Sequence, residues 1–218
     1  MKKKILLTIA SVSFIFITGA FLLSSCNPDD TTAPVITLNG NNPMTVVLNT
    51  DYIDPGATAT DDEDGDMTLT STTTVNPDLK GIYTTTFSAT DAAGNQASKT
   101  RTVNVVNEAD YLAGSYSVVD EIPGGTYPYT DQISPDYETN NKVSVTKFAC
   151  YQNGAVYFNI NGTSVILPLQ TVHCGTSPDI YDRAFSGSGT ISGTTITINY
   201  TEDTEGQTVL GTETYTKQ

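Results

Sequence analysis

The chain has 218 residues, with 24 Asp plus Glu against 10 Lys plus Arg, one His, three Cys and no Trp, and its formal net charge is −14. This length suits one or two domains with enough chain to bury a core. The excess of acid excludes a nucleic-acid-binding surface, which needs clustered Lys and Arg to neutralise phosphates. Threonine is abundant and glycine is frequent, so the composition predicts an all-β protein whose acidic side chains lie at turns and on strand exteriors.

The N-terminal segment has a positive start and a long apolar run. Lys2, Lys3 and Lys4 precede the apolar stretch from Ile5 to Leu23, which is long enough to span a bilayer. The run ends in Leu23-Ser24-Ser25-Cys26, which resembles the lipobox of bacterial lipoproteins. The resemblance implies that residues 1–25 are a signal peptide and that Cys26 becomes the lipidated N-terminus. We therefore predict a lipid anchor at Cys26 rather than a spanning helix.

Residues 26–33 form a polar tether. Cys26 is followed by Asn27, Pro28, Asp29 and Asp30, which resembles the acidic stretch that Bacteroidetes lipoproteins use for export to the cell surface. The resemblance implies an outer-membrane protein facing the cell exterior; an ordinary solvated tether is the alternative. Asp30-Thr31-Thr32 also resembles the O-glycosylation acceptor motif of that phylum, with Thr31 as the acceptor.

Residues 34–106 show short alternating runs bounded by turn residues, which predicts a small β-sandwich. The expected strands are Val35 to Leu38, Thr45 to Leu48, Met67 to Val75, Gly81 to Ala89 and Gln96 to Val106. In the last of these, Val103 and Val105 share one face and Thr102 and Asn104 share the other. A tight turn is expected at residues 91–95.

Five motifs in this segment occur in one order. They are Tyr52-Ile53-Asp54-Pro55-Gly56-Ala57, Ala59-Thr60-Asp61 with Asp64-Gly65-Asp66, Gly81-Ile82-Tyr83, Thr90-Asp91-Ala92-Ala93-Gly94-Asn95 and Arg101-Thr102-Val103. Together they resemble the Ig-like domain of bacterial surface proteins and of one type of pesticidal crystal protein. The resemblance implies a spacer or adhesion module without catalytic residues.

The acidic run in the second motif is a candidate metal site. Asp61, Asp62, Asp64 and Asp66 surround Gly65, and Ca²⁺ binds six to eight oxygens that such a loop supplies in part. The run lacks the twelve-residue calcium loop with its closing Glu. The alternative is a solvated turn in which Asp side chains accept hydrogen bonds from backbone N–H groups.

A polar hinge at residues 107–110 precedes a second unit at residues 111–218. A loop is expected from Asp120 to Asn141, where Gly and Pro recur. The expected strands are Lys142 to Cys150, Ala155 to Ile160, Thr163 to Leu167, Ala184 to Ser188, Thr194 to Tyr200 and Gln207 to Tyr215. Asn161-Gly162 is expected to form a hairpin turn. The pattern predicts an antiparallel β-barrel or β-sandwich.

The opening Gly114-Ser115-Tyr116 resembles the Gly-x-Trp start of lipocalin-like barrels, with Tyr in place of Trp. The strand order is also similar to that of lipocalin-like lipoprotein domains of Bacteroidetes.

No residue pattern indicates catalysis. His173 is the single histidine, no Gly-x-Ser-x-Gly motif is present, and the chain has no zinc spacing or phosphate loop. His173 and Cys174 are adjacent and would face opposite sides of a strand, and a loop position is expected for His173. We predict that the protein is not an enzyme.

Cys150 and Cys174 remain once Cys26 carries lipid. Outside the cytoplasm such a pair is more often bridged than free, so a disulfide is expected. Two buried thiols are the alternative.

Binding is the remaining class of function. Tyr127, Tyr129 and Tyr137 fall in the expected loop, where sugars could stack on them. The first hypothesis is a surface protein whose Ig-like spacer presents a β domain that binds a glycan or protein, as an accessory to an outer-membrane transporter for nutrient uptake. The second is a lipocalin-like carrier of a small apolar ligand, and the third is a purely structural or adhesive protein.

Overall fold

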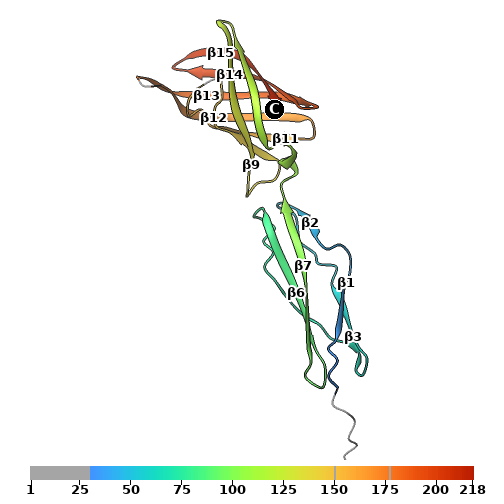
Figure 1. Cartoon of the computed structure of the whole chain (residues 1–218). Coiled ribbons are helices and arrows are strands. Elements are labelled where there is room, and N and C mark those ends of the chain that lie inside the picture. Colours follow the sequence, from blue (N-terminus) through green and yellow to red (C-terminus); the bar gives the residue numbers. More distant parts are fainter. Residues whose placement is uncertain (1–29, 150, 177) are drawn as a thin grey trace, which may run out of the picture.

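The computed structural model describes residues 30–149, 151–176 and 178–218. Within these residues the strands form two groups that follow one another along the molecule (Figure 1). The N-terminal group comprises β1 (Val35–Leu38), β2 (Met44–Val47), β3 (Ala57–Asp61), β4 (Gly65–Met67), β5 (Thr70–Thr73), β6 (Gly81–Thr90) and β7 (Gln96–Val106). The short 3₁₀ helix η1 (Glu108–Leu112) leads to the second group.

The second group is a closed antiparallel barrel. Its strands are β8 (Gly114–Ile122), β9 (Gly125–Pro135), β10 (Lys142–Val145), β11 (Val156–Asn161), β12 (Ser164–Thr176), β13 (Asp179–Ser192), β14 (Thr195–Thr204) and β15 (Gln207–Lys217). The predicted all-β class is confirmed. For residues 111–218 the sequence predicted a barrel or a sandwich, and the structure shows the barrel. Among the described residues, no helix has the length and apolar character that crossing a bilayer requires.

The first group is a sandwich of two sheets, β1-β3-β4 and β2-β7-β6-β5. Val103 and Val105 are buried while Thr102 and Asn104 are half-buried, so the predicted alternation along β7 is correct. The single strand predicted from Met67 to Val75 is wrong, because β4 pairs with β3 in one sheet and β5 pairs with β6 in the other. The chain changes sheets between them.

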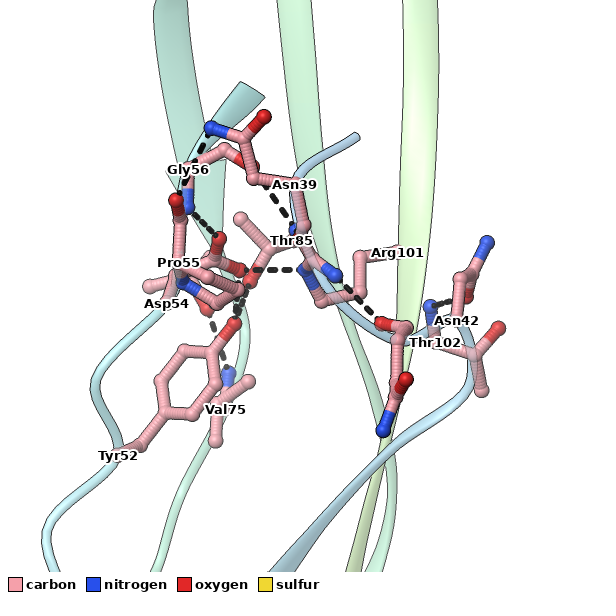
Figure 2. Close-up of polar contacts among 12 residues, drawn as sticks. Asn39, Asn42, Tyr52, Asp54, Pro55, Gly56, Val75, Thr85, Arg101 and Thr102 are labelled. Atoms are coloured by element: carbon pink, nitrogen blue, oxygen red, sulfur yellow. Dashed lines mark hydrogen bonds and ion pairs between the residues drawn. The ribbon is translucent and has the colours of Figure 1, made fainter. Parts of the chain in front are cut away.

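A buried arginine ties the two sheets of the sandwich together (Figure 2). Arg101 has no exposed surface, and its Nε donates to Asp54 Oδ2 at 2.9 Å. Its Nη1 and Nη2 donate to the carbonyl oxygens of Asn41, Asn39 and Gly56 at 2.5, 2.7 and 2.9 Å. A guanidinium carries five N–H groups in a rigid fork, and this pocket of oxygens matches that geometry.

The turn at Tyr52 to Gly56 supplies the partner of Arg101. Burial works against the charged form of Asp54, but hydrogen bonds from Tyr52, the Gly56 N–H and Arg101 outweigh it and lower the pKa of that carboxyl. Gly56 has φ +81°, a backbone conformation in which any residue with a side chain would be strained. The motif therefore favours the charged form of Asp54 beside the buried arginine.

The interior of the barrel is filled by side chains. Aromatic rings meet edge to face, with centroids 5.0 Å apart for Phe148 and Tyr200 and 5.2 Å for Phe148 and Phe185. Phe158 lies 5.8 Å from Phe148 in the same cluster, and Tyr215 lies 6.3 Å from Phe158. Rings packed in this way occupy the centre of the barrel. Side chains fill the interior of other eight-stranded barrels in the same manner.

The loop predicted from Asp120 to Asn141 is wrong over most of its length. β8 and β9 form a long hairpin that turns at Pro123 and Gly124. Pro128 is accommodated because β9 pairs only with β8 at that level; its pairing with β10 is limited to Ser134 and Pro135. A proline is tolerated where one edge of a strand is free.

Side-chain hydrogen bonds close the barrel where β9 and β10 separate. Asp131 is 5% exposed and accepts bonds from the backbone N–H of Thr146 and of Lys147, at 3.1 and 2.8 Å to Oδ2. The Thr146 hydroxyl donates to Asp131 Oδ1 at 2.5 Å. The buried Asp131 carboxylate thus takes the place of backbone hydrogen bonds between β9 and the segment that follows β10.

Other strand boundaries in the barrel also differ from those predicted. β12 continues past Leu167 because the register shifts between Leu167 and Gln170, around Pro168, and then resumes. This is the behaviour of a β-bulge rather than of a strand end. The hairpin turn predicted at Asn161-Gly162 lies one residue later, at Gly162 and Thr163, since Asn161 pairs with Ser164.

Polar bonds join the two groups of strands. Lys80 N donates to Tyr137 O at 2.7 Å, and Asn49 Nδ2 donates to Glu138 O at 3.0 Å. The segment predicted as a hinge begins with Asn107, which is 1% exposed and whose side chain accepts from Ala109 N and Asn141 N at 2.9 Å each. The β9–β10 loop therefore lies against the sandwich.

Candidate functional site

The barrel has two ends, and strand direction assigns every residue to one of them. The start of β8 and the β9–β10 loop lie at the end that contacts the sandwich, which we call the proximal end. The β8–β9 turn, the β12–β13 connection and the β14–β15 turn lie at the opposite, distal end, since all neighbouring strands are antiparallel. In Figure 1 the β8–β9 turn is the point of the barrel farthest from the sandwich.

The distal end contains a cavity of about 280 Å³, which we call the distal cavity. Its lining combines aromatic, acidic and small apolar side chains: Asp120, Ile122, Tyr127, Ala149, Tyr151, Tyr200 and Glu202. A second cavity of about 370 Å³ shares Tyr151 and Glu202 and adds Tyr181, Arg183 and residues of the β14–β15 turn. A groove of about 570 Å³ adjoins the first through Ile122 and Tyr200. The second cavity therefore borders the distal cavity along Tyr151 and Glu202.

Inward-facing residues become more polar toward the distal end. Along β14 the inward positions are Ile196, Ile198, Tyr200 and Glu202, all buried. β8 shows the same trend from Tyr116 through Val118 to Asp120. The core is thus apolar near the sandwich and polar beneath the distal cavity.

Two acids lie directly opposite each other under this cavity. Glu213 on β15 pairs with Asp120 on β8, and they are 0% and 2% exposed. Burial raises the pKa of Glu213 to about 8, although hydrogen bonds from Tyr129, Tyr215 and Ala149 N oppose the shift. Burial likewise raises the pKa of Asp120; its bond from Tyr200 opposes this, and the charges of Glu202 and Glu121 add to it. Like charges that face each other across strands are unfavourable, so protonation relieves this pair.

A buried ion pair marks the rim of the cavities. Arg183 Nη1 donates to Glu202 Oε1 and, at 2.9 Å, to the Tyr151 hydroxyl. The guanidinium carbon lies 4.0 Å from the centre of the Tyr151 ring and 5.8 Å from that of Tyr181. Arg183 Nε is buried and has no acceptor among the described residues. The rim therefore offers aromatic faces, carboxylate oxygens and a cationic donor side by side.

The three tyrosines predicted as ligand contacts lie in three different environments. Tyr127 lines the distal cavity and is 42% exposed. Tyr129 points into the barrel and donates to Glu213 Oε1, so it is part of the interior. Tyr137 is at the proximal end, where Lys80 Nζ lies 5.4 Å from its ring centre. The structure brings only Tyr127 of the three to the cavity.

Sequence reasoning missed Asp120, Arg183 and Glu202. Acidic residues were expected at turns and on strand exteriors, yet Asp120, Asp131, Glu202 and Glu213 are all buried. The alternation of strand residues could have identified Glu202, because it is two residues beyond Tyr200 and therefore lies on the same face of the strand. The strand predicted there ended at Tyr200, which hid this relation.

His173 lies in β12 and not in a loop, which corrects the prediction. Its Nδ1 is 2.9 Å from Asp182 Oδ1, and both side chains are more than two-thirds exposed. Cys174 is 1% exposed and faces the interior, as the alternation predicts. Burial raises the pKa of its thiol to about 11. Cys150 lies outside the described residues, so the disulfide with Cys174 stays a prediction.

The remaining predicted sites lie at the N-terminal end of the chain. Cys26 and the signal peptide lie outside the described residues, and Thr31 is exposed. Asp62 and Asp64 are exposed in the β3–β4 turn and Asp66 is exposed in β4, and Asp64 Oδ2 accepts a bond from Ala92 N at 2.6 Å. Asp61 instead lies together with Asp30 and Asp91.

The N-terminal sandwich, with its two sheets and its Asp54–Arg101 pair, is similar to a known family of domains. Residues 36–105 match the family model of the bacterial surface protein Ig-like domain. The sandwich of this chain is therefore similar to the Ig-like domain of bacterial surface proteins. The resemblance predicted from the five motifs is thereby confirmed for the sandwich, and no curated protein shows significant similarity to the chain.

Three solved structures resemble larger parts of the chain. A lipoprotein of Bacteroides thetaiotaomicron is 17% identical with a TM-score of 0.34, over 85% of this chain and 100% of that one. A candidate outer membrane protein of Bacteroides fragilis is 14% identical with a TM-score of 0.35, over 69% and 74%. Clostridium perfringens ZmpB, as CBM51-2 in complex with GlcNAc and INT domains, is 16% identical with a TM-score of 0.29, over 84% and 44%. Similarity at this level transfers no function to the present chain.

Proposed function

We propose that this chain is a lipid-anchored, non-enzymatic surface protein that binds an oligosaccharide at the distal end of its barrel. The Ig-like domain acts as the spacer between the anchor at Cys26 and the barrel. The observation that carries the proposal is the pair of cavities at the distal end, which share Tyr151 and Glu202; Tyr127 lines the distal cavity, and Tyr181 and Arg183 line the second.

The chemistry of this lining suits a sugar. Pyranose rings present apolar C–H faces that stack on aromatic rings, and Tyr127 and Tyr181 are 42% and 37% exposed there. Sugar hydroxyls donate to carboxylates and accept from guanidinium groups, and Glu202 and Arg183 offer both. Ligand sites generally combine aromatic walls with a few polar groups that fix orientation.

The charge of the site favours a neutral sugar over an acidic one. Asp120, Glu202 and Glu205 line the hollows, with Arg183 already paired to Glu202. The chain as a whole carries a net charge of −14. An acidic polysaccharide would be repelled by this surface.

The filled interior supports binding at the end of the barrel rather than inside it. Phe148, Phe158, Phe185 and Tyr215 occupy the centre, where a carrier of an apolar ligand needs an empty chamber. The hollows that adjoin this core are lined by charged and phenolic groups, which suit a polar ligand.

The two carboxyls of the distal cavity are both engaged within the protein. Asp120 accepts from the Tyr200 hydroxyl at 2.8 Å, and Glu202 is held by Arg183. Glycoside hydrolysis needs one carboxyl to donate a proton and a second to act as base or nucleophile. Engagement of both groups supports binding without cleavage.

A glycan array followed by calorimetry tests the proposal. The purified protein is expected to bind a neutral oligosaccharide, and Tyr127→Ala and Tyr181→Ala are each expected to weaken binding about tenfold, which is about 1.4 kcal/mol. Tyr111→Ala is the matched control, since Tyr111 is 56% exposed at the proximal end. Equal weakening by all three variants, or release of sugar fragments from the bound ligand, would overturn the proposal.

A further inference from the structure

Three acidic residues from separate parts of the chain meet at the end of the Ig-like domain where the described chain begins. Asp30 precedes β1, Asp61 ends β3 and Asp91 follows β6. One carboxylate oxygen from each lies within 4.8 Å of the others. We propose that these three carboxylates bind a calcium ion, which clamps the start of the domain to its two acidic turns.

Local hydrogen bonds already hold the three segments together. Asn95 Nδ2 donates to Asp30 O at 3.1 Å and to Asp91 Oδ2 at 2.9 Å. Asp64 Oδ2 accepts from Ala92 N, which joins the β3–β4 turn to the β6–β7 turn. The carboxylates are therefore preorganised by backbone and amide groups that carry no positive charge.

One oxygen in this cluster lacks any partner. Asp61 Oδ1 accepts from Glu63 N and Asp64 N at 3.0 and 3.2 Å, whereas Asp61 Oδ2 is buried and has no hydrogen-bond partner among the described residues. A buried acceptor without a partner is costly, and for a carboxylate the cost is larger. A cation would supply the missing partner.

The negative charge of the cluster is also uncompensated. Among the described residues, no ion pair joins Asp30, Asp61 or Asp91 to Lys, Arg or His. Asp91 is 6% exposed, and its carboxylate accepts hydrogen bonds from Asn95 N at 2.7 Å and Asn95 Nδ2 at 2.9 Å, which are neutral donors. Charged carboxylates this close repel one another unless a cation lies between them.

The donor set is suited to Ca²⁺. Hard oxygen ligands favour Ca²⁺ and Mg²⁺ over zinc or copper. Three carboxylates can each bind through one or two oxygens, and calcium accepts six to eight oxygens in irregular geometry, with water completing the shell. Magnesium requires a near-ideal octahedron and gives up its water less readily.

Calorimetry with CaCl₂ after removal of metals tests the site. The purified protein is expected to bind one Ca²⁺ and to unfold at a higher temperature when Ca²⁺ is present, because binding to the folded state alone stabilises it. Asp61→Asn keeps the acceptor for Glu63 N and Asp64 N but removes the charge, and should weaken binding at least tenfold. Asp62→Asn is the matched control in the same turn and should bind as the parent does.

Stability without calcium distinguishes a metal ligand from a structural residue. In EDTA, Asp61→Asn should unfold at or above the temperature of the parent protein, because it removes one of three neighbouring charges. A lower temperature would show that the carboxylate is compensated within the protein and would overturn the proposal. Absence of heat and of a thermal shift at millimolar Ca²⁺, or equal losses in Asp61→Asn and Asp62→Asn, would do the same.

Discussion

The two halves of the molecule bury charge in different ways. In the Ig-like domain Arg101 is surrounded by one carboxylate and three carbonyl oxygens, so its hydrogen-bonding capacity is used within the fold. In the barrel the described residues include the buried acids Asp120, Glu202 and Glu213, with Arg183 as the nearby cation. The first arrangement joins two sheets, whereas the second leaves polar groups facing a cavity.

This difference separates a structural role from a binding role. A buried ion pair that is also hydrogen-bonded to the backbone contributes mainly by being costly to break. Acids whose pKa values are raised by burial, in a cleft, are candidates for a functional site. The contrast supports a spacer that carries a binding domain, and it can be tested at each site.

The largest effect is expected at Arg101. Arg101→Met removes the cationic partner of Asp54 and one donor from each of three carbonyl oxygens, which should cost about 3–5 kcal/mol of unfolding free energy. Hydrogen exchange should accelerate in β2, β6 and β7 and remain slow in β12 to β14. Lys99→Met, two residues earlier in the same strand, is the control: Lys99 is exposed and donates a single hydrogen bond, to Ile36 O, so its loss should cost about 0.5–1.5 kcal/mol. An unchanged exchange rate in Arg101→Met would contradict the structural role.

Among single substitutions, a glycine in the barrel should show the next largest effect. A Cβ at Gly211 would lie 2.3 Å from the Tyr200 ring, so Gly211→Ala must displace this ring under the distal cavity. Overpacking of this kind costs about 1–3 kcal/mol. Gly124→Ala, where a Cβ would meet nothing within 4 Å, is the control. Denaturant unfolding followed by tyrosine circular dichroism measures both, and equal stability of the two variants would show that the Tyr200 ring moves freely.

The buried Glu213 should make stability depend on pH. Its pKa of about 8 in the folded protein exceeds the ordinary 4.5, so between these values the folded state keeps a proton that the unfolded chain has lost. The contribution of Glu213 to the unfolding free energy is therefore fully present below about pH 4.5. It is lost at about 1.4 kcal/mol per pH unit as the pH rises to about 8. Glu213→Gln, which stays neutral, should flatten this slope.

Glu121→Gln provides the comparison for the pH experiment. Glu121 lies on β8 beside Asp120 but is exposed, so the variant should keep the slope of the parent protein. If Glu213→Gln also kept that slope, Glu213 would be ionised in the folded state. The electrostatic description of the barrel interior would then be wrong.

The Ig-like domain was predictable because its determinants are local and ordered. The Tyr52 to Gly56 turn and Arg101 stand at fixed places in a recurring pattern, and the structure shows that they contact each other. The strand from Met67 to Val75 was not predictable, because the change of sheet depends on which strand each half pairs with. Which distant strands pair with each other cannot be predicted from a short segment of sequence.

The barrel was predicted as a class, but its site was not. Gly124, Gly125 and Pro128 indicated a loop, and the missing information was that β9 has a free edge at Pro128. That error hid the inward position of Asp120. The acidic cluster shows a related limit, since Asp61 was grouped with its neighbours in the chain, while the fold brings it to Asp30 and Asp91.

The ligand is expected to bind at the distal end of the barrel and not at the Ig-like domain. The most direct measurement is hydrogen exchange of the protein with and without the oligosaccharide that it binds. We predict protection in residues 120–127, 181–183 and 202–207, with no change in β1 to β7. Protection confined to the Ig-like domain or to the β9–β10 loop would show that the distal end is not the binding site.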